Sequence, residues 1–230
     1  MTETSLQSRV WVVIAAYNEA VTIARVASDV LSFGYQLVVV DDGSQDATLD
    51  IAIASGSHAI RHPVNLGQGA ALQTGIEFAL SRGAELLVTF DADGQHRASD
   101  IGVLVAALKR ERAEFALGSR FIGQSVRLPV ARRLLLLAAT QFTRLTTGLR
   151  LTDTHNGLRA MTRRGASSIH LRQNRMAHAS EILIQIAASG YHYVEVPVTV
   201  EYTAYSLAKG QRIGDSVMIL FDLFAGKLNR

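Results

Sequence analysis

The chain has 230 residues, a formal net charge of +3, no cysteine and 48% hydrophobic residues. That apolar content is ample for a buried core, and the lack of cysteine excludes disulfide bonds, thiolate nucleophiles and thiolate metal ligands. Aromatic residues are few and are not interleaved with basic ones, so we expect no nucleic acid partner. We also expect neither a signal peptide nor a membrane span, because no apolar run reaches the ~18 residues that a span requires.

The first half of the chain alternates apolar strands with helices. The predicted order is strand 10–16, a helix through 21–31 capped by Asn18 and stopped by Gly34, strand 36–40, helix 45–54, strand 58–61, helix 70–81 and strand 86–90. The strand segments are short and rich in β-branched residues, whereas the helical segments repeat apolar residues at helical spacing. This alternation predicts an α/β fold, Rossmann-like, with a mainly parallel sheet and helices on both faces.

Polar clusters follow four of these segments. They are Tyr17-Asn18-Glu19, Asp41-Asp42, the loop 65–69, and Asp91 with Asp93. Ligands of such sheets bind beyond the carboxyl ends of the strands, so the four clusters predict one shared site. The alternatives are local, because Asp42 can cap the next turn and the glycines of the 65–69 loop can form a tight helix entry.

Asp91 and Asp93 end the apolar run 86–90. In an extended chain residues i and i+2 point the same way, so both carboxylates can face one small volume. Two like charges held there attract a hard divalent ion such as Mg²⁺ or Mn²⁺. The alternative is a solvated corner made by Asp93 and Gly94.

The second half carries a group of arginines after a predicted strand at 115–118. The group comprises Arg120, Arg127, Arg132 and Arg133. Guanidinium groups match phosphate oxygens, so the group predicts an anion site, with a solvated basic face as the alternative. The next apolar segment, 134–145, is flanked by arginines and is too short to span a membrane, so it lies either at a membrane interface or in the core.

The last predicted strand covers residues 191–202. Its valines alternate with polar residues and it contains Pro197, which indicates a half-exposed strand near a sheet edge.

Six motifs stand in a fixed order along the chain: VVIAAYNEA, VVVDDGSQDAT, NLGQGAALQTGI, FDADGQH, GSRF and TDTHNGLRA. Together they closely resemble inverting family 2 glycosyltransferases of the GT-A fold, particularly the dolichyl- or polyprenyl-phosphate sugar transferase branch. The resemblance covers roughly residues 10–205. It implies a metal-dependent, inverting transfer of a sugar from a nucleotide-diphosphate sugar to polyprenyl phosphate. The alternatives are a hydroxyl acceptor on a glycan or protein, and a non-catalytic GT-A binding protein.

The resemblance also implies roles for individual residues. The donor would be bound by Ala15, Tyr17, Glu19, Asp41, Asp42, Gln68 and Asp91, a Mg²⁺ or Mn²⁺ ion by Asp91, Asp93 and Gln95, and the acceptor phosphate by Arg120 and one of Arg132 or Arg133, with Asp153 and Asp93 as catalytic residues. Ala15 stands where the family often has Pro, and we expect this difference to have only a small effect. Gln68 stands where the family often has Lys or Arg, which leaves the identity of the donor open.

Three further residues are weaker candidates. Glu181 is a second candidate base and His178 a structural residue or sugar contact, while His96 is expected to support the site rather than bind metal. Asp153 has a local alternative, which is to cap a turn and pair with Arg159.

Residues 1–210 are expected to form the GT-A domain, and residues 211–230 a C-terminal amphipathic helix near the membrane, with Lys227 and Arg230 facing anionic head groups. Lys209 and Arg212 either supply positive charge on closure over the donor or belong to an exposed linker. We expect a cytoplasmic protein, peripheral at the cytosolic membrane face and held there by an integral membrane partner. The sequence leaves open the donor base, the sugar and the oligomeric state, a homo-oligomer included.

Overall fold

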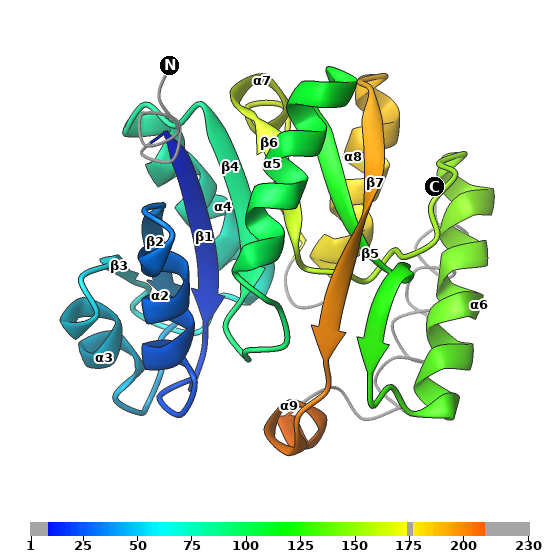
Figure 1. The fold of residues 1–230 in the computed structure, drawn as a ribbon. Coiled ribbons are helices and arrows are strands. Elements are labelled where there is room, and N and C mark those ends of the chain that lie inside the picture. The colour runs from blue at the N-terminus through cyan, green and yellow to red at the C-terminus, as the bar shows by residue number, and fades with distance from the viewer. Residues whose placement is uncertain (1–8, 174–176, 210–230) are drawn as a thin grey trace.

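The computed structural model describes residues 9–173 and 177–209 (Figure 1). The strands are β1 (Val10–Ala16), β2 (Gln36–Asp41), β3 (His58–Arg61), β4 (Leu86–Asp91), β5 (Phe115–Val126), β6 (Arg159–Thr162) and β7 (Tyr193–Glu201). The helices are α2 (Ile23–Ser32), α3 (Thr48–Ala54), α4 (Gln68–Ser81), α5 (Ser99–Glu111), α6 (Val130–Thr147), α7 (Arg163–Ala166), α8 (Ala177–Ser189) and α9 (Ala204–Lys209).

The strands form one sheet in the order β3-β2-β1-β4-β6-β5-β7. Only β6 runs antiparallel to its neighbours among these strands, so the prediction of a mainly parallel sheet is confirmed. The chain leaves β1 toward β2 on one side and later returns to place β4 on the other side. The carboxyl ends of β1 and β4 therefore flank a topological switch point, where such sheets bind their ligands.

Helices cover both faces of the sheet, as predicted (Figure 1). On β1, Val12 and Ile14 pack toward α2 and α5, whereas Trp11 and Val13 pack toward α4 and α8. A parallel strand buried on both faces needs apolar residues at every position, because alternate side chains enter opposite layers. This explains why residues 10–16 are an unbroken apolar run.

The predicted helix start at Asn18 is wrong, because α2 begins at Ile23 with Thr22 as its N-cap residue. Asn18 adopts a positive φ of 52°, and its side-chain oxygen accepts a hydrogen bond from the Gln45 backbone N–H at 2.8 Å. The side chain that would have capped α2 therefore joins the end of β1 to the turn after β2.

The predicted strand 115–118 is also too short, since β5 continues to Val126 past an irregularity between Ser119 and Gln124. This extension pairs with the far half of β7, which is an edge strand as predicted. The apolar segment 134–145 lies within the longer α6, which stands at one side of the molecule (Figure 1).

None of the helices in ranges 9–173 and 177–209 combines the length and apolarity needed to cross a bilayer. The predicted helix 211–230 and Arg212 lie outside the described residues, and so does the side chain of Lys209.

Candidate functional site

A cavity of about 430 Å³ opens at the carboxyl ends of the strands. Its lining comprises Ala15, Ala16, Tyr17, Glu19, Asp42, Asn65, Gly67, Gln68, Asp91, Ala92, Asp93, Gln95, His96, Arg120, Arg132, His155 and Val200. All four polar clusters that follow the strands contribute residues to it, so they lie around one cavity, as the sequence predicts.

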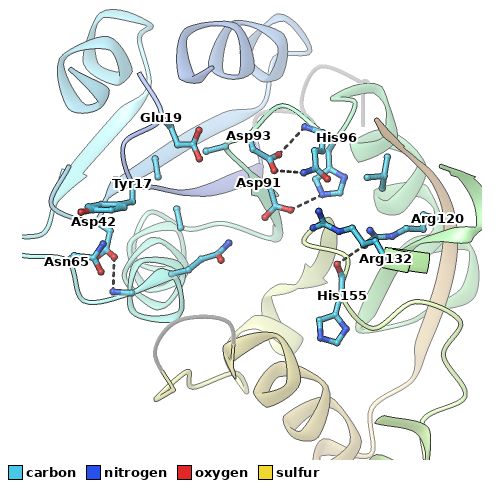
Figure 2. A pocket seen from close by; sticks show the side chains of 17 residues that line it. Tyr17, Glu19, Asp42, Asn65, Asp91, Asp93, His96, Arg120, Arg132 and His155 are labelled. Atoms are coloured by element: carbon cyan, nitrogen blue, oxygen red, sulfur yellow. Dashed lines mark hydrogen bonds and ion pairs between the residues drawn. The ribbon is translucent and has the colours of Figure 1, made fainter. Parts of the chain in front are cut away.

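The charged side chains divide the cavity into two sides. Figure 2 shows Asp91 and Asp93 between them, with Tyr17 and Asp42 on one side and the arginines Arg120 and Arg132 on the other. The acids come from the end of β4, the first side from the ends of β1 and β2, and the arginines from β5 and α6. One cavity thus combines a carboxylate pair with a cationic wall.

The two carboxylates at the centre have different partners. Asp91 Oδ2 is 2.9 Å from His96 Nε2, while Asp93 accepts hydrogen bonds from the backbone and side-chain amides of Gln95 at 3.0 and 2.7 Å. Burial and the nearby charge of Asp91 raise the pKa of Asp93 to about 6. Burial also acts to raise the pKa of Asp91, but the hydrogen bond and charge of His96, together with the charge of Arg159, outweigh it and lower that pKa.

The donor set around Asp93 fits a hard divalent cation. Burial, and next the charge of Asp91, raise the pKa of Asp93, and a cation bound between the two carboxylates would offset both effects. The Gln95 amide nitrogen bonds to Asp93, so its amide oxygen is available as a further ligand. Within the described residues no three His, Asp or Glu side chains are grouped closely enough to hold an ion. Water molecules would complete the shell, as is usual for Mg²⁺.

Asp42 lies in the cavity wall, and its carboxylate is hydrogen-bonded to the 65–69 loop. Its carboxylate accepts the backbone N–H groups of Leu66 and Gly67 at 2.9 and 2.7 Å, and it lies 2.8 Å from His62 Nδ1. Asp42 therefore shapes the 65–69 loop rather than merely capping the turn after β2. Asp41 is buried beneath this rim and does not line the cavity.

Arg120 is the best-anchored cation of the site. Its Nε donates to Asp153 Oδ2 at 2.6 Å, Nη2 donates to the His155 carbonyl oxygen at 2.6 Å, and Nη1 donates to the Tyr202 hydroxyl. A guanidinium has five N–H groups, so these contacts leave two that can meet an anion in the cavity. Burial acts to lower the pKa of Arg120, but Asp153 and Tyr202 outweigh it and raise that pKa.

Asp153 is only 3% exposed and lies behind Arg120, outside the cavity lining. The ion pair with Arg120 replaces the predicted alternative pairing with Arg159. Arg159 is itself buried among the charges of Asp91, Asp153 and Arg120. Asp153 is therefore linked to the cavity through the Arg120 guanidinium with which it pairs.

Of the two adjacent arginines of α6, only one lines the cavity. Arg132 lines the cavity, with its guanidinium carbon 5.2 Å from the centre of the Tyr202 ring, while Arg133 is exposed and does not line it. Of the weaker candidates, Glu181 accepts the backbone N–H groups of Arg172 and Gln173 and lies outside the cavity lining, as does buried His178. His96 lines the cavity and supports Asp91, as expected.

Sequence reasoning gave no role to His155 or Tyr202. Burial lowers the pKa of His155 to about 4, so its ring is neutral at pH 7. Its backbone carbonyl oxygen accepts the hydrogen bond from Arg120. His155 lies inside the motif TDTHNGLRA and could have been singled out there. Tyr202 follows a strand that also carries Tyr193, and no sequence signal distinguishes the two.

Comparison with known proteins agrees with this geometry. The pattern of Glycosyl transferase family 2 matches residues 11–169, and the chain belongs to this family. It is 32% identical over 237 residues to a UDP-N-acetylglucosamine–dolichyl-phosphate N-acetylglucosaminyltransferase of Methanococcus voltae, covering 94% of this chain and 93% of that protein. It is 30% identical over 205 residues to an undecaprenyl-phosphate mannosyltransferase of Micrococcus luteus, covering 83% of each.

The fold has solved counterparts. Glucosyl-3-phosphoglycerate synthase from Mycobacterium tuberculosis, solved with Mg²⁺ and UDP, superposes with a TM-score of 0.72 at 21% identity, covering 98% of this chain and 83% of that one. The GT-A fold is thus confirmed, and the chain is a glycosyltransferase whose relatives include dolichyl- and polyprenyl-phosphate sugar transferases.

Proposed function

We propose that this chain transfers a sugar from a nucleotide-diphosphate sugar to polyprenyl phosphate with inversion at the sugar carbon, in the presence of a divalent metal ion. The observation that carries the proposal is the single cavity in which Asp91 and Asp93 separate a polar side from the guanidinium groups of Arg120 and Arg132. A reaction between two phosphate-bearing substrates needs such a division, because each phosphate must be held without repelling the other.

The donor would lie on the side of Tyr17, Glu19, Asp42 and Gln68. Asp91, Asp93 and Gln95 would hold a Mg²⁺ or Mn²⁺ ion, and a metal bound there would neutralise the diphosphate leaving group. The solved structure with Mg²⁺ and UDP and the relative named for a UDP-sugar donor support this assignment. Asp41, beneath the cavity, would act by holding the Ser44 turn through its hydrogen bond with the Ser44 N–H at 3.2 Å.

The acceptor would lie on the arginine side. Arg120 and Arg132 would grip the lipid phosphate, and the two relatives named for dolichyl and undecaprenyl phosphate support this acceptor class. Arg133 is exposed, so among the adjacent arginines we assign the contact to Arg132.

The chemistry places little demand on a general base. A phosphate oxygen of the lipid attacks the sugar carbon, the bond from that carbon to the donor diphosphate breaks, and the nucleoside diphosphate leaves with the bonding electrons. The attacking phosphate is already anionic at neutral pH, so no proton must be removed from it. Positioning and charge neutralisation should therefore dominate the rate, and Asp153 would contribute by orienting Arg120.

The direct test is an assay of purified protein with polyprenyl phosphate, a panel of nucleotide sugars, and Mg²⁺ or Mn²⁺. We expect one lipid-linked sugar whose formation stops when the metal is removed with EDTA. Transfer to a hydroxyl acceptor instead would support the alternative enzyme. No lipid-linked product with any donor would contradict the proposal. A thermal-shift screen of nucleoside diphosphates with Mn²⁺ would identify the base.

The close contact between Gly157 and the Asp91 carboxylate allows a test of the proposed role of Asp91 in metal and donor binding. A Cβ added at Gly157 would lie 2.2 and 2.3 Å from the two carboxylate oxygens of Asp91, so Gly157→Ala must displace that carboxylate. We expect this variant to weaken Mn²⁺-dependent UDP binding by about tenfold or more in calorimetry. The matched control is Gly102→Ala, whose Cβ would meet only the Tyr35 hydroxyl at 3.5 Å. Wild-type affinity in Gly157→Ala would argue against this role of Asp91.

A cytosolic membrane face is the proposed working place, and α6 supports it. Val130, Leu134, Leu137 and Leu145 are 74%, 64%, 40% and 86% exposed and share one face of this helix. The stretch 115–152 contains six arginines and no Asp or Glu. An apolar face within a purely basic stretch suits an anionic lipid surface, beside the arginine side of the cavity. Residues 211–230, which the sequence predicts to be a membrane-proximal segment beyond the GT-A domain, and an integral membrane partner would add to this contact.

We therefore expect the full chain to float with anionic phosphatidylglycerol vesicles more than with neutral phosphatidylcholine vesicles, and less at high salt. The double variant Leu134→Glu/Leu145→Glu should reduce the bound fraction by about tenfold or more, because two apolar side chains lose their burial in lipid. Ile53→Glu on α3 is the control, since Ile53 is 57% exposed on another helix. Equal flotation of the double variant and the wild type would show that α6 is not the contact.

A further inference from the structure

Tyr202 contacts both arginines of the cavity wall. It follows β7 directly and is 1% exposed, and its backbone N–H donates to the Val126 carbonyl oxygen at 3.1 Å. Its hydroxyl accepts a hydrogen bond from Arg120 Nη1, and its ring lies 5.2 Å from the guanidinium carbon of Arg132. One rigid side chain thus joins an arginine from β5 to an arginine from α6.

We infer that Tyr202 is a positioning residue that holds Arg120 and Arg132 as one anion-binding pair for the acceptor phosphate. The inference rests on the proposed function for the identity of the anion. Tyr202 does not itself line the cavity, so it acts through the two guanidinium groups that do.

The two arginines depend on Tyr202 to different degrees. Arg120 also binds Asp153 and the His155 carbonyl oxygen, so its position is fixed from three directions. Arg132 has no carboxylate within ion-pair distance in the described part of the chain, and the Tyr202 ring is the contact that the structure gives its guanidinium. An arginine side chain has many rotamers, and without that ring Arg132 would lose the contact that fixes its head group.

The neutral ring also reduces the cost of bringing two cations together. The face of a tyrosine ring carries partial negative charge, and its hydroxyl oxygen offers a lone pair to an N–H donor. Tyr202 presents the face to Arg132 and the oxygen to Arg120. Both guanidinium groups can therefore stay near each other before an anion arrives, which is the preorganisation that tight binding requires.

Two substitutions separate the two contacts. Tyr202→Phe keeps the ring under Arg132 and removes the acceptor of Arg120, whereas Tyr202→Leu removes both. We expect the KM for polyprenyl phosphate to rise about fivefold in Tyr202→Phe and about thirtyfold in Tyr202→Leu, while the Mn²⁺-dependent affinity for UDP, measured by calorimetry, stays within twofold. The donor side is expected to be unaffected because the hydroxyl and the ring face of Tyr202 meet Arg120 and Arg132, which both belong to the arginine side.

Tyr193→Phe is the matched control, because Tyr193 begins the strand β7 that Tyr202 follows, and its hydroxyl accepts the Arg150 backbone N–H at 2.8 Å, outside the cavity. It should leave both constants at their wild-type values. Tyr202→Phe keeps its packing, so it tests the inference even if Tyr202→Leu does not fold. An unchanged acceptor KM in Tyr202→Phe would overturn the inference, and so would an equal loss of donor affinity.

A failure of the proposed function can be distinguished from a failure of the inference about Tyr202. If wild-type protein transfers no sugar to polyprenyl phosphate, the same variants can be titrated with inorganic phosphate. Weaker phosphate binding in Tyr202→Phe and Tyr202→Leu, with Tyr193→Phe unchanged, would support Tyr202 as the positioning residue of an anion site while the lipid acceptor is rejected. Equal phosphate affinity in all four proteins, or none in the wild type, would reject the pair itself.

Discussion

Asp93→Asn is expected to lower the rate of sugar transfer by at least ~100-fold. Burial and the charge of Asp91 raise the pKa of Asp93 to about 6, so a nearby cation would stabilise the charged form of this carboxylate. The amide of Asn keeps the shape but removes the charge that would hold the metal and, through it, the donor diphosphate. The measurements are kcat with saturating substrates and Mn²⁺-dependent UDP binding by calorimetry.

Asp29→Asn is the control for this substitution. Asp29 is exposed on α2 and lies 3.9 Å from Arg25, a surface pair that should contribute little. The variant should keep wild-type rate and affinity. If Asp93→Asn bound UDP with the same Mn²⁺ dependence as the wild type, the carboxylate pair would not be the metal site.

The second large effect is expected on stability. Arg120→Met would leave Asp153 buried at 3% exposure without its cation, and the free energy of unfolding should fall by about 3–5 kcal/mol. Asp153→Asn should also be destabilising, because it would leave the buried Arg120 guanidinium without its carboxylate. The double variant should cost clearly less than the sum of the two, because neither unpaired charge is then left in the interior. Urea unfolding of the four proteins gives the coupling energy.

Arg9→Met provides the comparison, since the ion pair of Arg9 with Glu85 is about half exposed on each side. Its loss should change the free energy of unfolding by no more than about 1 kcal/mol. If the losses of unfolding free energy in the two single variants simply added up in the double variant, Arg120 and Asp153 would not be coupled. The proposed positioning role of Asp153 would then be wrong.

The main features of the fold were predictable because they depend on local pattern. The apolar run 10–16, and the run 86–90 in which Thr89 is the one polar residue, identify strands buried on both faces, and the intervening helical periodicity implies crossover connections. Asn18 was misassigned because a side chain that can cap a helix can equally bond a distant backbone N–H. Only the approach of Gln45 decided between the two uses.

The site, like the fold, has features that were predictable from the sequence and features that were not. Asp91 and Asp93 were found because they stand at the carboxyl end of the apolar strand β4, where such sheets bind ligands, although residues 92 and 93 form a turn and not the extended chain that their spacing suggested. Asp153 was expected to face the acceptor, yet it lies behind Arg120, because a carboxylate and a guanidinium brought together in a buried place pair with each other. Their proximity arises from packing β5 beside the loop before β6, at a sequence separation of 33 residues.

The sequence by itself therefore determined the α/β class, the rim at which ligands bind and the carboxylate pair at its centre, since all three depend on periodicity and on neighbours along the chain. Only the tertiary structure decided that Arg132 and not Arg133 faces the cavity, and that Tyr202 joins it to Arg120. The physical reason is that the rotation of α6 and the position of Tyr202 after β7 are set by packing between distant segments, which no local pattern encodes.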